Sequence, residues 1–233
     1  MKKITITQIS EKKIKAGNPL LQMEDFPNEL SFDEGELVEL VDSRQKFVAK
    51  AYLAKQNKGV GWVFSLDNAD SFNEAFFKKQ FEKAKRKRTD LQSDPETTTY
   101  RLFNAEGDGI PGVTIDHYDG FAVVSWYSEG IFRYQTAIIA AFQAVFPETK
   151  GIYEKFRYQR KDGLISRYVR GDAAPTPLIV KENGINYATY LDDGLMTGIF
   201  LDQRDVRGAL TERYAAGKRV LNTFSYTGAF SVA

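Results

Sequence analysis

The sequence contains no cysteine and only one histidine, His117, among its 233 residues. Disulfide bonds, zinc sites built from Cys and His, and catalysis by a thiolate of this chain are therefore excluded. The longest uncharged apolar stretch, from Tyr134 to Pro147, is too short to span a bilayer, and the charged N-terminus lacks the apolar core of a signal peptide. We therefore expect a cytoplasmic protein without a membrane segment.

Hydrophobic residues make up 42% of the chain, which together with 18 glycines is the composition of an ordinary packed protein. At about 150 residues per domain, the length predicts one or two domains. The net charge is only +1, but residues 23–42 hold eight acids and no base, whereas residues 78–88 hold seven bases and one acid. Because polyanions respond to local positive fields, such a basic segment is a candidate for binding a phosphate backbone. A solvated helix face is the alternative explanation.

Short alternating segments separated by turn signals characterise the first 66 residues. In the segment from Phe47 to Leu53, every second residue is apolar and falls on one face of a strand. Turn-forming residues such as Asp33-Glu34-Gly35 lie between these segments. The pattern predicts a small all-β domain over residues 1–70, folded as a compact β-barrel.

A basic amphipathic helix is predicted to follow the barrel. Ser71 and Glu74 have the spacing of a capping box at a helix start. Apolar residues then recur on one helical face, at Phe72, Phe76, Phe77, Phe81, Ala84 and Leu91. Four cations gather on the opposite face and are candidate nucleic-acid contacts: Lys78, Lys79, Lys85 and Arg86.

The whole segment 71–174 is predicted to form an α+β domain in which a helix covers an antiparallel sheet. Asp119-Gly120 and Asp162-Gly163 are hairpin signals, and Ile131–Phe146 is an apolar segment typical of a helix that ends at a proline. We assign no role to His117, since a lone histidine on a strand is more often structural than catalytic.

Two further features of this domain are ambiguous. The Gly-rich stretch 105–112 leads into a predicted strand, so we interpret it as turn chemistry, with Asp108 a minor catalytic candidate. Residues 150–170 interleave aromatic and basic side chains, which suits base stacking and phosphate contacts as well as it suits sheet packing. Arg157 and Arg160 are the candidate RNA contacts in that segment.

Pro175 and Pro177 mark a boundary before the last segment, residues 175–233. Asn183-Gly184 predicts a hairpin, and Asp202–Tyr214 has the apolar spacing of a helix. Val220–Phe224 has the composition of a buried strand, and the polar turn Ser225–Gly228 leads from it into a second helix. Such a junction points backbone amides at an anion, either a nucleotide or the methionine carboxylate of S-adenosylmethionine.

Three sequence segments resemble motifs of a known protein family. The strings TGIFLDQRDVR (197–207) and VLNTFSYTGAFSVA (220–233) resemble the opening of the class I methyltransferase domain in the bacterial PUA-domain ribosomal RNA cytosine-C5 methyltransferases. YRLFNAEGDGIPGVTIDHYDGFAVV (100–124) is similar to the signature of that family's central α+β domain. The resemblance implies an α/β and α+β multidomain protein: a PUA-like RNA-binding barrel, a central domain and a Rossmann-like methyltransferase domain.

The resemblance also implies a cofactor, S-adenosylmethionine, and a partner, ribosomal RNA. Phe200, Gln203 and Arg204 would help frame the cofactor pocket. Its floor, beneath the methionine and ribose, would come from six further residues: Asn222, Phe224, Ser225, Tyr226, Thr227 and Gly228. One position departs from the family pattern, because Met196 stands where a basic or polar residue usually precedes Thr-Gly.

Cytosine-C5 transfer uses a cysteine that attacks C6 and makes C5 nucleophilic toward the sulfonium methyl, after which a base removes the C5 proton. No cysteine is present here. Since several βαβ units of about 30 residues are needed to build a doubly wound domain, we expect an incomplete methyltransferase domain, with the cysteine beyond the chain end. We further expect residues 1–233 to be inactive alone, and the unpaired strand to favour association with another chain, such as a homodimer.

Two alternatives remain open at this point. A noncatalytic RNA-binding module, or pseudoenzyme, would use the barrel and the basic surfaces without transferring a methyl group. A ribosomal RNA methyltransferase acting on a purine nitrogen would have the same architecture but would not need a thiol. A cysteine and an acidic ribose ligand downstream of residue 233 in the coding DNA would favour the cytosine-C5 reading.

Overall fold

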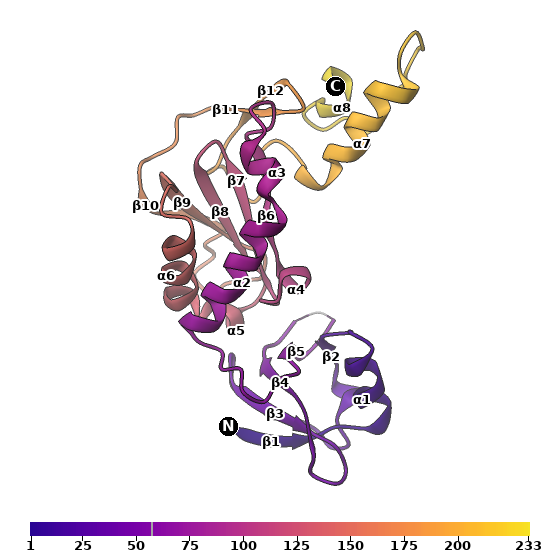
Figure 1. The fold of residues 1–233 in the computed structure, drawn as a ribbon, viewed down its shortest axis with the longest axis vertical. Helices are drawn as coiled ribbons and strands as arrows, with labels where there is room; N and C mark the ends of the chain where they lie inside the picture. Colours follow the sequence, from indigo (N-terminus) through magenta and orange to yellow (C-terminus); the bar gives the residue numbers. More distant parts are fainter. Residues whose placement is uncertain (57) are drawn as a thin grey trace.

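A five-stranded sheet occupies one end of the computed structural model, which describes residues 1–56 and 58–233 (Figure 1). Its strand order is β1-β3-β4-β5-β2, with β1 and β3 parallel and the other pairs antiparallel. The strands are β1 (Lys2–Thr5), β2 (Leu20–Leu21), β3 (Leu37–Val41), β4 (Phe47–Leu53) and β5 (Gly61–Ser65). Alternating apolar side chains of these strands, including Ile4, Val38, Leu40, Ala49 and Ala51, form its core.

This first domain is not all-β, so that part of the sequence expectation is wrong. Helix α1 (Gln8–Lys15) follows β1, and a 3₁₀ turn, η1 (Met23–Asp25), follows β2. The Thr7 side chain caps α1 by accepting from the Ser10 amide, and the buried Ser10 hydroxyl donates to Asp25 at 2.6 Å. The helix has only eight residues, of which Ser10 and Ile14 are buried. The polar cap and the buried hydrogen bond fix its position against η1.

The basic amphipathic helix is present as α2 (Glu74–Lys87), followed by the short α3 (Thr89–Ser93). Its cap is Asn73, whose side chain accepts from the Phe76 amide at 3.1 Å, and not the Ser71 that the capping-box spacing indicates. The predicted apolar face is confirmed, since Phe76, Phe77, Phe81 and Ala84 are buried.

The central domain is built on a second five-stranded sheet with the order β10-β9-β8-β7-β6. Both hairpin signals are confirmed: Asp119 and Gly120 have positive φ between β7 and β8, and the loop containing Gly163 joins β9 to β10. The strands are β6 (Thr99–Asn104), β7 (Val113–Tyr118), β8 (Phe121–Trp126), β9 (Gly151–Phe156) and β10 (Ser166–Gly171). The Gly-rich stretch folds as the turn-like α4 (Ala105–Asp108), which ends at the left-handed Gly109.

The central sheet is mixed, whereas the sequence predicted an antiparallel one. The chain leaves β8, forms α5 (Glu129–Phe132) and α6 (Gln135–Val145), and returns as β9 parallel to β8. A helical crossover permits this parallel pairing, and the predicted single helix is broken at Arg133-Tyr134. Helices α2 and α6 pack together over one face of the sheet (Figure 1). The other face is left for the C-terminal segment.

That segment begins with the hairpin of β11 (Leu178–Glu182) and β12 (Ile185–Thr189), whose predicted Asn183-Gly184 turn has positive φ at both residues. Its side chains Leu178, Val180 and Tyr187 pack on Tyr118, Val123 and Tyr153 of the uncovered sheet face. The chain continues through η2 (Leu201–Gln203), α7 (Arg204–Ala209), the π-helical turn η3 (Leu210–Tyr214) and α8 (Ala229–Val232).

The strand expected at Val220–Phe224 is not formed, which corrects the sequence prediction. Within the described residues no neighbouring strand pairs with this segment, and a strand is not stable without a partner for its backbone groups. Leu221 and Phe224 are therefore exposed. The helix expected after Gly228 does form, as α8, and the mixed α/β class of the chain is confirmed.

Candidate functional site

The structure brings together the two segments that the sequence marks as a cofactor pocket, 197–204 and 222–228. The Thr227 hydroxyl donates to the Gly198 carbonyl oxygen at 2.6 Å. The rings of Phe200 and Tyr226 lie against each other with centroids 5.4 Å apart and a tilt of 55°. Residues about 25 positions apart in the chain thus form one surface at the start of α8.

The backbone of this surface is strained at two positions. Phe224 and Tyr226 have φ of 58° and 53°, in the left-handed region that bulky residues rarely adopt, whereas Gly228 adopts its φ of 84° freely. Backbone strain of this kind concentrates at binding and catalytic sites. A Cβ built on Gly228 would meet no atom within 4 Å, so the space in front of this glycine is open. The loop can therefore accept a ligand close to its backbone.

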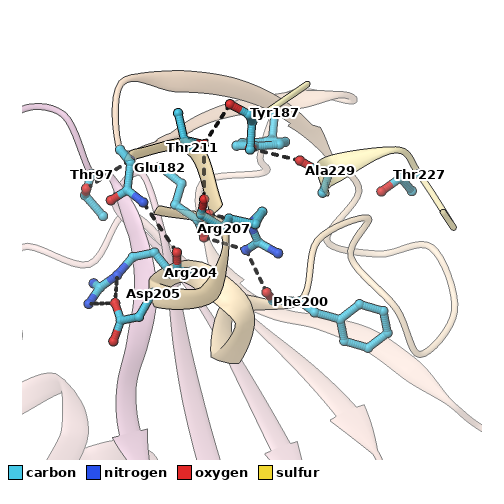
Figure 2. Close-up of polar contacts among 12 residues, drawn as sticks. Thr97, Glu182, Tyr187, Phe200, Arg204, Asp205, Arg207, Thr211, Thr227 and Ala229 are labelled. Carbon is cyan, nitrogen blue, oxygen red and sulfur yellow. Dashed lines mark hydrogen bonds and ion pairs between the residues drawn. The ribbon is translucent and has the colours of Figure 1, made fainter. Parts of the chain in front are cut away.

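A buried ion pair contacts the backbone of this surface at Phe200 (Figure 2). The Arg207 guanidinium donates to both carboxylate oxygens of Glu182, at 2.7 and 2.8 Å, and to the Phe200 carbonyl oxygen at 2.8 Å. Arg207 and Glu182 are 2% and 1% exposed, and the guanidinium lies 5.4 Å from the centre of the Phe230 ring. Strand β11, helix α7 and the loop carrying Phe200 are thereby held together. The sequence analysis missed this pair, because no local pattern relates Glu182 to Arg207.

Among the described residues, the side chains of the other predicted cofactor residues form no hydrogen bond or ion pair across the two segments. Arg204 pairs with its neighbour Asp205 at 2.9 Å. The Asn222 side chain donates to the Ser231 hydroxyl at 2.8 Å. Phe224 and Ser225 are exposed, and Gln203 lies in the turn η2. The contacts therefore favour Phe200, Tyr226, Thr227 and Gly228 as the core of the set.

A cavity of about 310 Å³ opens between the loop carrying Phe200 and the sheet face opposite α2 and α6. Arg101 on β6 is fixed there by Asp116 on β7, whose carboxylate accepts two bonds from it at 2.6 and 3.2 Å. Lys155 on β9 is fully buried, and its ammonium donates to the Gly194 carbonyl oxygen at 2.5 Å. Arg157, two residues further on, is exposed at the mouth. Burial lowers the pKa of Lys155 to about 8, so the amine is predominantly charged at neutral pH.

Part of the positive charge in this cavity could have been predicted from the sequence. Tyr153 and Lys155 alternate along β9 and therefore share one face of the sheet, and Arg157, directly after the end of β9, lines the same cavity as Lys155. The alternation marks a cationic face, but only the position of the hairpin β11–β12 shows that this face is partly covered. Arg157 was predicted as an RNA contact, whereas Lys155 and Arg101 were not.

The remaining predicted RNA contacts lie on the opposite side of the central sheet. On α2, Lys79 lies 3.7 Å from Asp70, and Lys85 lies 3.3 Å from Glu148 and donates to the Val145 carbonyl oxygen. Lys78 and Arg86 also lie on this helix. Arg160 donates to Asp162 at 2.6 and 2.9 Å and lies over the rings of Phe132 and Phe156. Arg160 therefore packs against the helix-covered side, away from the cavity.

The contacts of Asp108 and His117 indicate structural roles for both residues. Asp108 is buried and accepts from Lys87 and Arg88, which together lower its pKa against the opposing effect of burial. His117 accepts from the Gly120 amide at 3.2 Å, and burial lowers its pKa to about 4, so it is neutral at physiological pH. Among the described residues no group of His, Asp and Glu side chains could hold a metal ion, and no helix is long and apolar enough to cross a membrane.

Comparison with protein families identifies two parts of the chain. Residues 4–66 match the model of the PUA-like domain. Residues 132–233 match the model of the S-adenosylmethionine-dependent methyltransferases. The first match covers most of the N-terminal sheet, and the second runs from the end of α5 to residue 233.

Two proteins are similar to this chain in sequence. YwbD of Bacillus subtilis (strain 168), proposed by its name to be a ribosomal RNA large subunit methyltransferase, is 45% identical over 100% of this chain and 60% of its own length. Ribosomal RNA large subunit methyltransferase I of Cronobacter sakazakii (strain ATCC BAA-894) is 37% identical over 85% of this chain and 50% of its own length.

Two solved structures are also similar. A proposed SAM-dependent methyltransferase from Streptococcus mutans superposes with a TM-score of 0.91 at 46% identity. The superposition covers 99% of this chain and 59% of the S. mutans chain. SMU.776, a proposed methyltransferase complexed with SAH, gives a TM-score of 0.92 at 46% identity over the same shares of each chain. The chain thus spans about 60% of the length of the first of these relatives.

Proposed function

We propose that this protein takes part in S-adenosylmethionine-dependent methylation of large-subunit ribosomal RNA. The observation that carries the proposal is the junction of segments 197–200 and 224–228 into one open surface, through the Thr227–Gly198 hydrogen bond and the Phe200–Tyr226 contact. The names of YwbD and of the C. sakazakii methyltransferase, and the SAH complex of SMU.776, support the same reaction class.

The residues of the loop fit the cofactor in three respects. The open space at Gly228 admits a ligand to the backbone, where amides can donate to the methionine carboxylate. The rings of Phe200 and Tyr226 offer apolar faces that suit an adenine or an adjacent cation. Gln203, Arg204, Asn222, Phe224 and Ser225 would complete the pocket. When bound, S-adenosylmethionine supplies an electrophilic methyl group, and this chain binds and orients it.

We propose cytosine C5 as the acceptor atom, in keeping with the sequence resemblance. The thiol that this chemistry needs for attack at C6 is not among residues 1–233. We therefore expect these residues alone to bind cofactor and RNA but to leave C5 transfer at background. Transfer to a purine nitrogen needs no thiol, and a noncatalytic RNA-binding role needs no cofactor, so the three candidates differ in measurable ways.

Two measurements separate these candidates. The first is a calorimetric titration of the 233-residue chain with S-adenosylmethionine, in which we expect saturable binding. The second measures labelled methyl transfer to unmodified large-subunit ribosomal RNA and identifies any modified nucleoside. RNA binding without cofactor binding would favour the noncatalytic role. A methylated purine would favour the nitrogen-directed reaction, and 5-methylcytosine made by residues 1–233 alone would overturn the thiol argument.

The cations of α2 provide a separate prediction about RNA binding. Replacing Lys78, Lys79, Lys85 and Arg86 with glutamate is expected to weaken binding to structured ribosomal RNA fragments, because each lost phosphate contact removes released counterions. Each contact should remove about 0.7–0.9 from the slope of log affinity against log salt concentration. Since Lys79 and Lys85 already lie beside carboxylates, Lys78 and Arg86 should account for most of the change. An unchanged affinity and slope in the quadruple variant would remove α2 from the RNA interface.

We also propose that the protein is located in the cytoplasm, where its proposed ribosomal RNA partner lies. A second proposal is that the chain self-associates through its C-terminal segment. Leu221 and Phe224 are exposed large apolar side chains close in sequence to the candidate cofactor loop. A second copy of the chain covering them would remove apolar surface from water. Sedimentation measurements on the chain and on a Leu221→Ser/Phe224→Ser variant test this. A wild-type chain that remains monomeric would overturn it.

A further inference from the structure

Two cavities on the central domain adjoin each other. The cavity of about 310 Å³ beneath Phe200 shares Arg101 and Tyr127 with a second cavity of about 460 Å³. The second cavity reaches the PUA-like domain, where Pro19, Leu20 and Trp62 form part of its wall. Both volumes fall within the range of ligand sites, about 300–1,000 Å³. We call the two cavities together the sheet groove, with Arg101 and Tyr127 at its waist.

The chemistry of the sheet groove suits an anionic strand. Arg101 is oriented by its two bonds to Asp116, and the buried Lys155 ammonium lies along the same wall. Arg157 is exposed at the groove, and among the described residues no carboxylate forms an ion pair with Arg157 or Lys155. Over both cavities the lining holds four cations, which are Arg101, Lys155, Arg157 and Lys58, and three carboxylates, which are Asp116, Asp202 and Glu106. The groove therefore carries fixed positive charge that is only partly neutralised.

The waist and the second cavity add features that a phosphate site alone would not need. Tyr127 is a half-buried aromatic residue whose carbonyl oxygen accepts from Gln56 of the PUA-like domain, so the two domains meet at this residue. Thr114 lines the second cavity and is 4% exposed, and its hydroxyl has no hydrogen-bond partner among the residues that the structure describes. An unpartnered buried hydroxyl is costly unless a ligand completes it. An aromatic face and a free polar atom are what an unpaired nucleobase can use.

Given the proposed function, on which this inference rests, we propose that the sheet groove binds a single-stranded segment of the RNA. The strand enters beside the PUA-like domain, passes the waist at Arg101 and Tyr127, and ends at the loop carrying Phe200. Arg157 and Arg101 contact phosphates, and Tyr127 stacks on a base. This path lies on the sheet face opposite α2 and α6, so it is distinct from any contact that α2 makes with structured RNA.

Fluorescence anisotropy with an unstructured large-subunit ribosomal RNA oligonucleotide tests the groove. Arg157→Glu is expected to weaken binding about tenfold or more at low salt, and Tyr127→Ala about fivefold or more through lost stacking. The matched control is Arg170→Glu, which makes the same charge change at an exposed arginine on the edge strand β10 and should alter affinity less than about twofold.

Photocrosslinking with 4-thiouridine in the same oligonucleotide keeps the test independent of any variant's folding. We expect crosslinked peptides of the unsubstituted chain to contain Tyr127 or its groove neighbours. RNA binding that is unchanged in both groove variants, or crosslinks confined to α2, would overturn the groove while leaving the proposed function in place. Absence of any RNA binding by the unsubstituted chain would overturn both.

Discussion

Replacing Arg207 with alanine is expected to destabilise the segment that carries Phe200 by about 3–5 kcal/mol, the usual cost of leaving one member of a buried ion pair uncompensated. The Glu182 carboxylate would stay buried without its two bonds, and the Phe200 carbonyl oxygen would lose its donor. Amide hydrogen exchange of residues 200–207 should accelerate accordingly, because that local opening would become easier. S-adenosylmethionine affinity should fall with it, since Phe200 would no longer be held against Tyr226.

Two further variants show what the ion pair contributes. Arg204→Ala removes an arginine from the same helix, but one that pairs at the surface with Asp205, so its effect on exchange should stay below about 1 kcal/mol. A double Arg207→Met/Glu182→Leu variant should recover much of the lost stability, because apolar replacements remove both buried charges. It should not recover the cofactor affinity, since methionine cannot donate to the Phe200 carbonyl. An Arg207→Ala variant no less stable than Arg204→Ala would contradict this role.

Replacing Gly228 with valine is expected to reduce S-adenosylmethionine binding by tenfold or more, about 1.4 kcal/mol at least. Gly228 has φ of 84°, which a β-branched residue adopts only with strain. The side chain would also project into the space in front of the loop, where no protein atom lies within 4 Å of a Cβ. In the proposed site that space belongs to the ligand, so the substitution acts on binding more than on packing.

Gly217 offers a matched control for this measurement. It too has positive φ, 69°, and a Cβ there would also meet no atom within 4 Å, but it lies in the turn after η3. Gly217→Val should therefore impose similar backbone strain and leave cofactor affinity nearly unchanged. Calorimetric titration of the two variants separates general strain from loss of the site. Equal affinities in Gly228→Val and the unsubstituted chain would place the cofactor elsewhere.

The local elements of the fold were predictable where short-range chemistry decides them. Asp119-Gly120 and Asn183-Gly184 form the hairpin turns that their residue types favour, with positive φ at all four positions. The phenylalanines of α2 face the core because their spacing matches the helical period. Helix α1 was missed because it spans only eight residues, Gln8–Lys15, which is too short for a helical repeat of apolar residues to be recognised in the sequence.

The Val220–Phe224 segment illustrates the opposite case. Its composition favours a strand, but a strand forms only when another chain segment pairs with its amides and carbonyls, and none of the described residues does so. The parallel pairing of β8 and β9 was likewise not predictable from hairpin signals. It depends on how α5 and α6 carry the chain across the sheet.

The two segments of the candidate site were predictable from the sequence, because the motifs around Phe200 and Gly228 are local and can be recognised without a fold. The surroundings of these motifs depend on the tertiary structure. Three features join residues from distant elements. They are the pairing of Arg207 with Glu182, the burial of Lys155 beneath the 194–202 loop, and the adjoining cavities at Arg101 and Tyr127. Such contacts follow from chain topology and packing, because a buried charge finds its partner across space and not along the sequence.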